Sequence, residues 1–249
     1  MIARRALVVL GLATTGGAVA AEALRVLSAG ALEPALSAAL ERWRSTGGGD
    51  VSVAFATAPR IAERMAAGER PDLVLAPRGL IERLERAGDL VAEPVAVGSV
   101  GVGIAVRAGA PVPAIHDEAS LREHLLAADA VVFNRASTGL YMERLLDRMG
   151  LTPAIEAKAV RFPDGDGVLR RIAAGEGREI AFAAATEIAL FRERGVRFVA
   201  PLPDALQNRT AYAAALLNGG TRIAEGRRFL AFLGSAASRT AMAEAGVEQ

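Results

Sequence analysis

The stretch that divides this chain in two is VAVGSVGVGIAV, residues 95–106. It is long and almost wholly apolar, it carries three glycines, and no helical pattern follows it for more than ten residues. Segments on both sides of it alternate between strand and helix patterns, so a strand of this length predicts a crossing from one lobe to another. A second long apolar strand at 210–217 predicts the return crossing.

Three strand-then-helix units precede the first crossing. Their strands and following helices are expected at 24–28 and 32–44, at 51–56 and 59–67, and at 72–76 and 80–87. Short apolar runs followed by apolar residues at helical spacing are typical of such units. Three units in a row predict a parallel sheet with right-handed connections.

The segment between the two crossings alternates in the same way. Helices are expected at 120–127, 139–149, 167–174 and 187–193, with strands at 130–133, 157–160, 180–184 and 196–199. Two helices, at 223–233 and 236–245, close the chain. The predicted fold class is α/β, with two Rossmann-like lobes and a hinged cleft at the carboxyl ends of their strands. Lobe 1 is predicted to comprise 22–97 and 212–249, and lobe 2 to comprise 98–211.

Residues 1–21 have the pattern of a signal peptide. Arg4 and Arg5 precede an apolar run at 6–13, and Ala18-Val19-Ala20 supplies a cleavage pattern of small residues. The run is shorter than the roughly 20 apolar residues that span a bilayer. We therefore expect cleavage after Ala20 or Ala21 and a periplasmic protein, the alternative being an uncleaved N-terminal anchor.

Composition excludes several kinds of function. The 249 residues include 29 Lys and Arg against 28 Asp and Glu, no Cys and only two His. A nearly neutral chain offers no strong attraction to nucleic acid. The absence of Cys excludes disulfides, thiolate metal sites and Cys nucleophiles, and two His make a His-rich metal site improbable. We expect no cofactor, no metal and no nucleic-acid partner.

Several segments resemble periplasmic solute-binding proteins of the molybdate-binding type. The similar segments are 24–32 (LRVLSAGAL), 71–76 (PDLVLA), 137–141 (STGLY), 210–217 (TAYAAALL) and 226–235 (GRRFLAFLGS). Their order extends over more than 200 residues. The resemblance implies a type II periplasmic binding protein fold and a small anionic ligand. It also implies the membrane subunits of an ABC importer as partner, and a monomeric protein.

The resemblance also implies a binding site made of neutral donors. Carried over residue by residue, it comprises Ser28, Gly30, Ala31, Thr57, Ala58, Ser137, Thr138, Tyr141 and Gly167. Main-chain N–H groups at helix N-termini and hydroxyl groups suit an oxyanion. Three positions lack a hydroxyl that the family has, namely Ala31, Ala58 and Ala184. These losses predict a ligand other than molybdate or tungstate.

Three arginines follow predicted strands. Arg60, Arg78 and Arg135 are expected on the cleft side of the two sheets. A guanidinium pairs with a carboxylate through two parallel hydrogen bonds, which suits planar organic acids better than a small tetrahedral dianion. The alternative interpretation is that these are ordinary solvated surface arginines.

Two glycine-containing motifs lack the features of a dinucleotide-binding site and of a calcium site. The glycines at 98–103 lie within a strand without a following helix, so they are no dinucleotide fingerprint. In Asp164-Gly165-Asp166-Gly167 the ligand spacing of a calcium loop is missing, and Asp166 is expected to cap the helix that follows.

An enzyme is the alternative to a binding protein. Aconitate isomerases resemble molybdate-binding proteins and act on a tricarboxylate, which requires a group that moves a proton next to a carboxylate. Candidate proton carriers are Ser28, Tyr141, Asp166 and Glu187, and the sequence singles out none of them.

Overall fold

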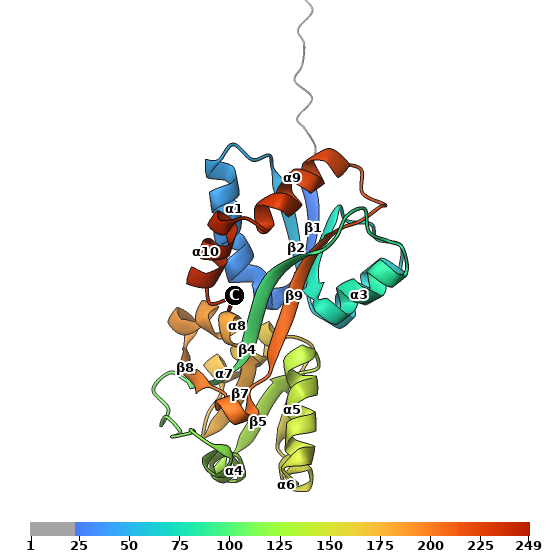
Figure 1. The fold of residues 1–249 in the computed structure, drawn as a ribbon. Coiled ribbons are helices and arrows are strands. Elements are labelled where there is room, and N and C mark those ends of the chain that lie inside the picture. The colour runs from blue at the N-terminus through green and yellow to red at the C-terminus, as the bar shows by residue number, and fades with distance from the viewer. Residues whose placement is uncertain (1–22) are drawn as a thin grey trace, which may run out of the picture.

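Strand β4 (Val95–Arg107) passes from one lobe of the molecule into the other in the computed structural model, which describes residues 23–249 (Figure 1). Its first half pairs with β9 (Arg209–Leu216), and its second half pairs with β7 (Glu179–Ala184) and β8 (Val196–Pro201). The predicted two-lobed α/β fold and its first crossing are confirmed.

The expected signal peptide at 1–21 lies outside the described residues, and no helix within 23–249 is long and apolar enough to span a membrane.

Lobe 1 contains the sheet order β2-β1-β3-β9-β4. Strands β1 (Leu24–Ala29), β2 (Val51–Ala56) and β3 (Leu73–Pro77) are parallel, and β9 enters antiparallel between β3 and β4. The helical segments are η1 (Gly30–Leu32), α1 (Glu33–Ser45), α2 (Ala58–Ala66), α3 (Arg78–Arg86), α9 (Ile223–Leu233) and α10 (Ala236–Glu244).

The core of lobe 1 joins the two ends of the described chain. Leu24 and Leu27 of β1 lie in the same buried cluster as Phe229 of α9 and Met242 of α10. The rings of Trp43 and Phe229 meet edge to face, with centroids 5.2 Å apart. Lobe 1 is therefore complete only when the last two helices are in place.

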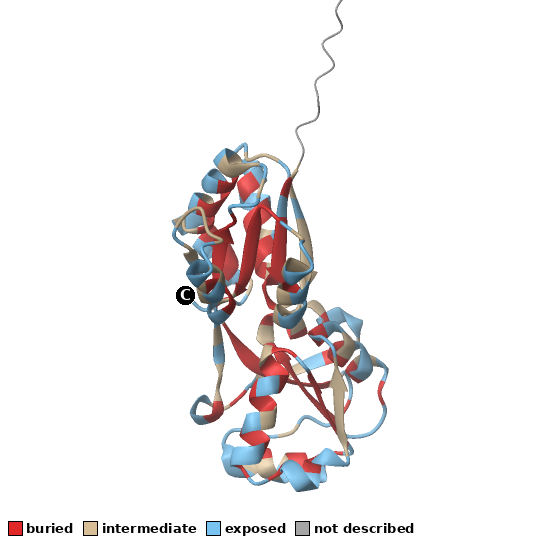
Figure 2. Ribbon diagram, turned by 90° about the vertical axis from the view of Figure 1, so that its right-hand side faces the viewer, coloured by how far each residue is buried: buried red, intermediate tan, exposed pale blue. Residues whose placement is uncertain are grey.

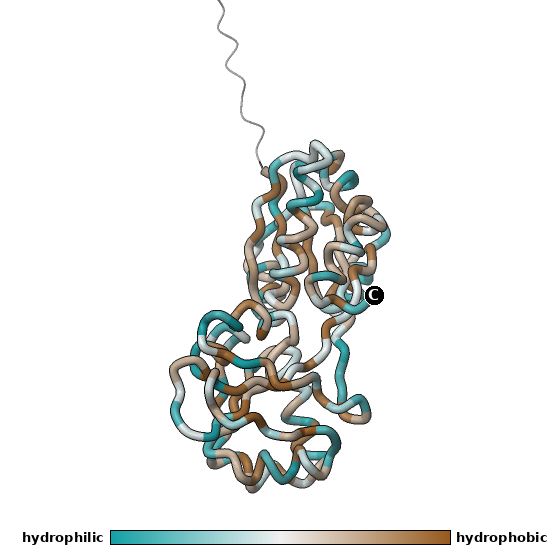
Figure 3. The backbone as a smooth tube through the Cα atoms, turned by 90° about the vertical axis from the view of Figure 1, so that its left-hand side faces the viewer, coloured by the Kyte–Doolittle hydropathy of each residue, from teal (hydrophilic) through white to brown (hydrophobic). Residues whose placement is uncertain are grey.

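Lobe 2 is a sheet with a core on each face. It comprises α4 (Glu118–Ala127), β5 (Ala130–Asn134), α5 (Ser137–Arg148), α6 (Thr152–Glu156), β6 (Ala159–Phe162), α7 (Gly165–Ala174), β7, α8 (Ala185–Leu190), η2 (Arg192–Arg194) and β8. Val131 and Phe133 of β5 face one core, and Ala130 and Val132 face the other. Figure 2 shows the buried strands inside both lobes, and Figure 3 shows hydrophilic segments in the outer loops. Such strands, buried on both faces, are the continuous apolar runs that the sequence contains.

Helices α3, α4, α5, α7 and α8 begin two residues before their predicted starts, and two further elements differ as well. Helix α6 was not expected, and β6 lies two residues later than the strand predicted at 157–160, because Ala157 and Lys158 close the turn after α6. Helix α8 begins at Ala185 rather than at Glu187. That shift places Glu187 in the first helical turn, three residues after the N-cap residue Ala184.

Between the lobes, the side chain of Gln207 makes hydrogen bonds to β4 of the kind that a neighbouring strand would make. The Gln207 amide accepts a hydrogen bond from the Val102 N–H at 2.8 Å and donates to the Val102 carbonyl at 3.1 Å. Val102 is where β4 leaves β9 and joins β7. The Gln207 side chain therefore satisfies the backbone of β4 at the change of partner.

The C-terminal residues close on the same strand. Ser99 and Glu248 exchange two main-chain hydrogen bonds, of 2.7 and 2.8 Å, and Arg209 contacts the Glu248 carboxylate at 2.6 Å. Gly98 makes this approach possible, because its φ is 115° and a Cβ there would lie 2.5 Å from the Glu248 carbonyl oxygen. The end of the chain is thus fixed beside the hinge.

Asp72 joins three segments of lobe 1. Its side chain is buried and accepts hydrogen bonds from the N–H groups of Arg25 (2.8 Å), Thr221 (2.9 Å) and Arg222 (3.3 Å). One carboxylate therefore satisfies main-chain donors at the start of β1 and in the loop before α9.

We predict that Asp72→Ala lowers the free energy of unfolding by about 1–3 kcal/mol, because three part-buried main-chain N–H groups lose their acceptor. Urea denaturation measures this. Asp50→Ala, at an exposed side chain, is the control and should stay within about 0.5 kcal/mol of the wild type. Equal stability of the two variants would show that the Asp72 carboxylate is dispensable.

Candidate functional site

The cleft between the lobes contains a small chamber, which we call the inner chamber. Its free volume is about 30 Å³. It is lined from lobe 1 by Ala29, Gly30, Ala31, Ala56, Thr57, Ala58, Pro77 and Tyr212, and from lobe 2 by Asn134, Ala136, Ser137, Thr138, Gly165, Ala184 and Glu187. Most of these residues follow the carboxyl ends of strands, which is where open α/β sheets bind ligands.

Helix N-termini reach the inner chamber from both lobes. Helix α2 begins after Thr57 and helix α5 begins after Ala136, and neither N-cap side chain accepts a hydrogen bond from its helix. The first N–H groups of a helix have no intrahelical acceptor, and together with the helix dipole they favour an anion. The inner chamber is therefore built to offer neutral donors from two sides.

Asn134 shapes the α5 side of the inner chamber. Its Oδ1 atom accepts hydrogen bonds from the N–H groups of Ala136 and Gly139, both at 3.0 Å. Gly139 is required here, because a Cβ would lie 1.4 Å from the Asn134 carbonyl oxygen. The tight turn leaves the N–H groups of Ser137 and Thr138 at the open end of the helix.

Glu187 introduces a carboxyl group into this donor set. It belongs to the first turn of α8 and is only partly exposed. Burial raises the pKa of Glu187 to about 7, and the N–H group of Ala184 opposes this rise, while the charges of Asp164, Glu33 and Asp166 add to it. Tyr212 lies in the same chamber, and burial, followed by the charge of Glu187, raises the pKa of its hydroxyl.

Two glycines allow the lobes to approach the Glu187 carboxyl. A Cβ on Gly165 would lie 2.2 Å from one carboxyl oxygen, and a Cβ on Gly30 would lie 3.3 Å from the other. Gly30 belongs to lobe 1 and Gly165 opens α7 in lobe 2. The carboxyl group therefore lies where the two lobes meet.

Helix α8 also ties the lobes together beside the inner chamber. The buried Thr186 hydroxyl donates a 2.6 Å hydrogen bond to the carbonyl of Ala31 in lobe 1. An Ala31 carbonyl without that donor would be buried and unsatisfied. This contact joins the two lobes at the base of the cleft.

A larger outer chamber of about 1070 Å³ adjoins the inner one, sharing Ala56 and Thr57 with it. It is lined by Phe55, Ala56, Thr57, Pro59, Arg60, Glu63, Arg64 and Glu69 from lobe 1 and by Arg135, Arg161, Pro163 and Asp164 from lobe 2. Seven of the twelve residues that line the outer chamber are charged, and its four arginines come from both lobes.

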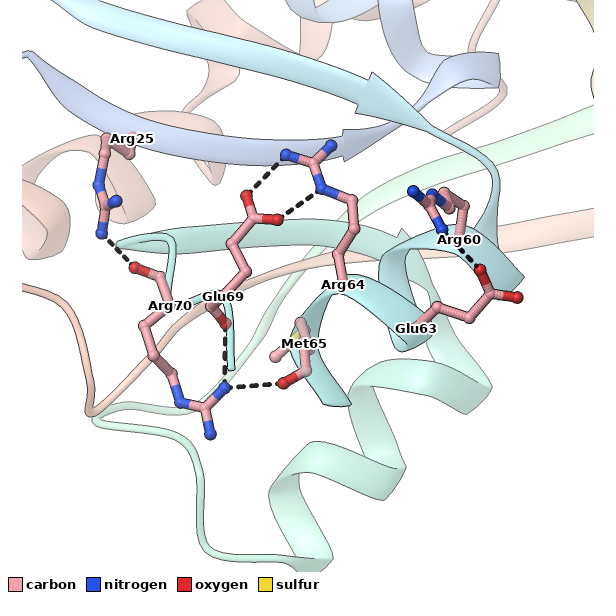
Figure 4. Close-up of polar contacts among 7 residues, drawn as sticks. All are labelled: Arg25, Arg60, Glu63, Arg64, Met65, Glu69 and Arg70. Atoms are coloured by element: carbon pink, nitrogen blue, oxygen red, sulfur yellow. Dashed lines mark hydrogen bonds and ion pairs between the residues drawn. The ribbon is translucent and has the colours of Figure 1, made fainter. Parts of the chain in front are cut away.

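Two of these arginines are paired with carboxylates of the protein. Arg64 donates two hydrogen bonds to Glu69, of 2.5 and 2.6 Å, and they hold the pKa of Glu69 below its usual value (Figure 4). Arg161 contacts the carboxylates of Glu143 and Glu156 at 2.9 and 2.7 Å. Both guanidinium charges are therefore already paired within the protein.

The other two arginines are available. Within residues 23–249, the ion pair of Arg60 is with Glu63, at 3.1 Å, and both side chains are mostly exposed. Figure 4 shows the two residues on α2. An exposed pair of this kind contributes little stability. No ion pair of the Arg135 side chain is found within residues 23–249, and Arg135 is exposed. Arg60 and Arg135 thus face one chamber from opposite lobes.

The structure brings most of the predicted site residues together. Gly30, Ala31, Thr57, Ala58, Ser137 and Thr138 line the inner chamber, and Arg60 and Arg135 line the outer one. The three positions without the family hydroxyl, Ala31, Ala58 and Ala184, all line the inner chamber.

Three predicted residues lie elsewhere. Ser28 is fully buried and its hydroxyl donates to the Ala29 carbonyl, because its side chain points into the sheet. Tyr141 lies in the core of lobe 2 and donates to the Leu206 carbonyl at 2.5 Å. Arg78 lines a separate groove and pairs with Glu82 at 2.9 Å along α3.

The expectations for the turn at 164–167 also need correction. Asp164, not Asp166, is the N-cap of α7, and it accepts a 2.8 Å hydrogen bond from the Gly167 N–H. Asp166 pairs with Arg170. Gly167 therefore has its donor occupied, and Gly165 is the glycine of this turn that lines the inner chamber.

The sequence did not predict that Asn134, Gly165 and Tyr212 line the inner chamber. Glu187 was predicted as a candidate proton carrier, but its place in this chamber was not predicted. Asn134 and Gly165 each precede or open a helix after a strand, which is a signal that could have been used. Within residues 23–249, no group of three or more His, Asp or Glu residues could hold a metal ion.

Comparison with known proteins gives a family match along nearly the whole described chain. Residues 24–248 match the model of the family described as bacterial extracellular solute-binding protein. An aconitate isomerase from Pseudomonas sp. is 27% identical over 232 residues, covering 90% of this chain and 87% of that protein.

Solved structures of low sequence identity share the fold. The periplasmic molybdate-binding protein of Azotobacter vinelandii superposes with a TM-score of 0.73 at 14% identity, covering 91% of this chain and 99% of that one. A sulfate-binding protein from Mycobacterium tuberculosis gives a TM-score of 0.73 at 18% identity, covering 90% and 86%.

Proposed function

The chain belongs to the bacterial extracellular solute-binding protein family, and from that premise we propose that it is a periplasmic receptor for a small organic anion. In this proposal the two lobes close on the ligand, and the closed protein delivers it to the membrane subunits of an ABC importer. The observation that carries the proposal is the meeting of the α2 and α5 N-termini, one from each lobe, at the inner chamber.

The pair of chambers supports a carboxylate as the ligand class. The inner chamber offers main-chain donors but lacks hydroxyls at Ala31, Ala58 and Ala184, which would complete a site for a tetrahedral oxyanion. The outer chamber adds Arg60 and Arg135, whose planar guanidinium groups match carboxylates. In this proposal a di- or tricarboxylate places one carboxylate in each of the two adjoining chambers, which share Ala56 and Thr57.

The first test is a thermal-shift screen of the protein with molybdate, tungstate, sulfate, fumarate, citrate and trans-aconitate. A carboxylate should raise the unfolding midpoint most, because a ligand at 100 times its Kd stabilises the fold by about 2.7 kcal/mol. Molybdate or tungstate should bind at least about tenfold more weakly than the best carboxylate, equivalent to about 1.4 kcal/mol. Tightest binding of molybdate or tungstate would contradict the ligand class.

Arg135→Ala tests the outer chamber. The variant should lose about 2–5 kcal/mol of binding free energy for the best carboxylate, because a desolvated carboxylate loses its partner. Arg135→Lys should recover part of the loss, since a point charge cannot form the two-pronged contact. Calorimetry measures both.

Arg78→Ala is the matched control for that experiment. Arg78 also follows a strand of an α/β lobe, but it pairs with Glu82 in a separate groove. It should bind the carboxylate like the wild type. Equal affinities of Arg135→Ala and Arg78→Ala would remove Arg135 from the site.

A second candidate function is favoured by Glu187. An isomerase acting on a tricarboxylate needs a group that takes a proton from one carbon and returns it to another, with no net change in protons. A carboxyl group with a pKa near 7 is suited to both halves of that transfer. The similarity to an aconitate isomerase supports testing this activity on this chain.

The isomerase candidate predicts that the wild type interconverts trans- and cis-aconitate, which proton NMR follows directly. Glu187→Gln should reduce turnover by about 10²–10⁴, because the amide cannot accept the proton. Glu193→Gln, at an exposed position of η2, is the control and should keep full activity. Absence of conversion by the wild type would leave the receptor function alone.

A further inference from the structure

We infer that Glu187 takes up a proton when the inner chamber binds an anion, so that its carboxylic acid donates a hydrogen bond to the ligand. The inference rests on the proposed function, because it concerns the same chamber. It assigns to Glu187 the role of a hydrogen-bond donor to the ionised ligand of the proposed receptor.

The lining of the inner chamber supplies no counter-charge for Glu187. Its residues include no Arg, Lys or His, and no ion pair of Glu187 occurs within residues 23–249. An anion placed beside an ionised Glu187 would bring two like charges together in a confined space. Like charges at close range force one group to hold a proton.

The groups packed around α8 act in the same direction. The charges that act most strongly on the Glu187 carboxyl are those of Asp164 and Asp166 at the start of α7 and of Glu33 at the start of α1, and all three are acidic. Tyr212 faces it from β9 and is uncharged, because burial raises the pKa of its hydroxyl. The basic residues of η2 follow the C-terminal end of α8, whereas Glu187 is in its first turn. One of them, Arg194, lies over the Phe191 ring.

The geometry gives the protonated carboxyl a place to act. The Glu187 carboxyl lies between Gly30 and Gly165, one from each lobe, where the absence of Cβ atoms leaves room. A carboxylic acid there adds a donor to the main-chain donors of α2 and α5. It therefore takes the place of one of the hydroxyl groups that Ala31, Ala58 and Ala184 lack.

A dependence of affinity on pH follows. Without ligand the Glu187 carboxyl is half protonated near pH 7, so the binding-competent fraction falls as the pH rises through that value. A ligand that needs the protonated form should bind about tenfold more weakly at pH 8 than at pH 6.

The decisive measurement is calorimetry with fumarate and with trans-aconitate at pH 6 and pH 8. Fumarate is included because both of its carboxyl groups are ionised at either pH. The wild type should show the tenfold loss at pH 8 for fumarate. Glu187→Gln should bind equally at both pH values and close to the wild type at pH 6, because the amide keeps a donor and cannot ionise. The control Glu193→Gln should behave as the wild type.

A ligand-free measurement tests the same carboxyl separately. The pKa of this carboxyl is higher in the folded protein than in the unfolded chain. The carboxyl therefore contributes stability that is fully present below its unfolded-state pKa and is lost as the pH rises through about 7. The unfolding midpoint of Glu187→Gln should therefore exceed that of the wild type by more at pH 8 than at pH 5, with no such trend in Glu193→Gln.

The outcomes separate the two proposals. If neither probe binds the wild type or Glu187→Gln at either pH, the receptor for organic anions is contradicted. If fumarate binds the wild type equally at both pH values, or Glu187→Gln keeps the tenfold dependence, the receptor stands and proton uptake by Glu187 is wrong. A Glu187→Gln midpoint that follows the wild type at both pH values also overturns it.

Discussion

The backbone hydrogen bonds of strand β4 are the constraint on which the arrangement of both lobes depends. One strand supplies pairing partners to two sheets, so its N–H and C=O groups must change neighbours at the waist without being left unpaired. Gln207 resolves the change by offering its side-chain amide to Val102. The backbone of β4 is thereby satisfied where it passes between the lobes, and the cleft is where the strands of both sheets end.

Much of this fold could be predicted because period and length are local properties of the sequence. The runs at 95–106 and 51–56 are apolar and bounded by turn residues, and the strands occur where those runs do. The cleft residues 57–58 and 137–138 were predicted from the resemblance and from their position after strands. The boundary of α8 was less predictable, because the alanine-rich segment before Glu187 fits a strand and a helix equally well.

The direction of side chains was harder to predict than their position in the chain. Arg60 and Arg78 both follow strands of lobe 1, yet only Arg60 faces the outer chamber. Ser28 is buried in a strand whose neighbouring residues are also buried, and the hydroxyl of Tyr141 donates to a carbonyl in the core of lobe 2. These outcomes depend on packing between elements far apart in the sequence. The Glu187 environment is of the same kind, since it combines groups from α1, α7 and α8.

The discontinuity of lobe 1 has a consequence for the order in which the protein can form. Strand β9 fills the middle of the lobe 1 sheet, and α9 and α10 complete its core, so residues 23–101 lack their neighbours until 209–249 have been synthesised. The elements of lobe 2 from β4 to β8 are contiguous in the chain, so each of them has its neighbours earlier than the elements of lobe 1 do. Domains generally fold as units in the order in which they emerge. In this chain the elements of lobe 2 can therefore be complete before residues 209–249 close lobe 1.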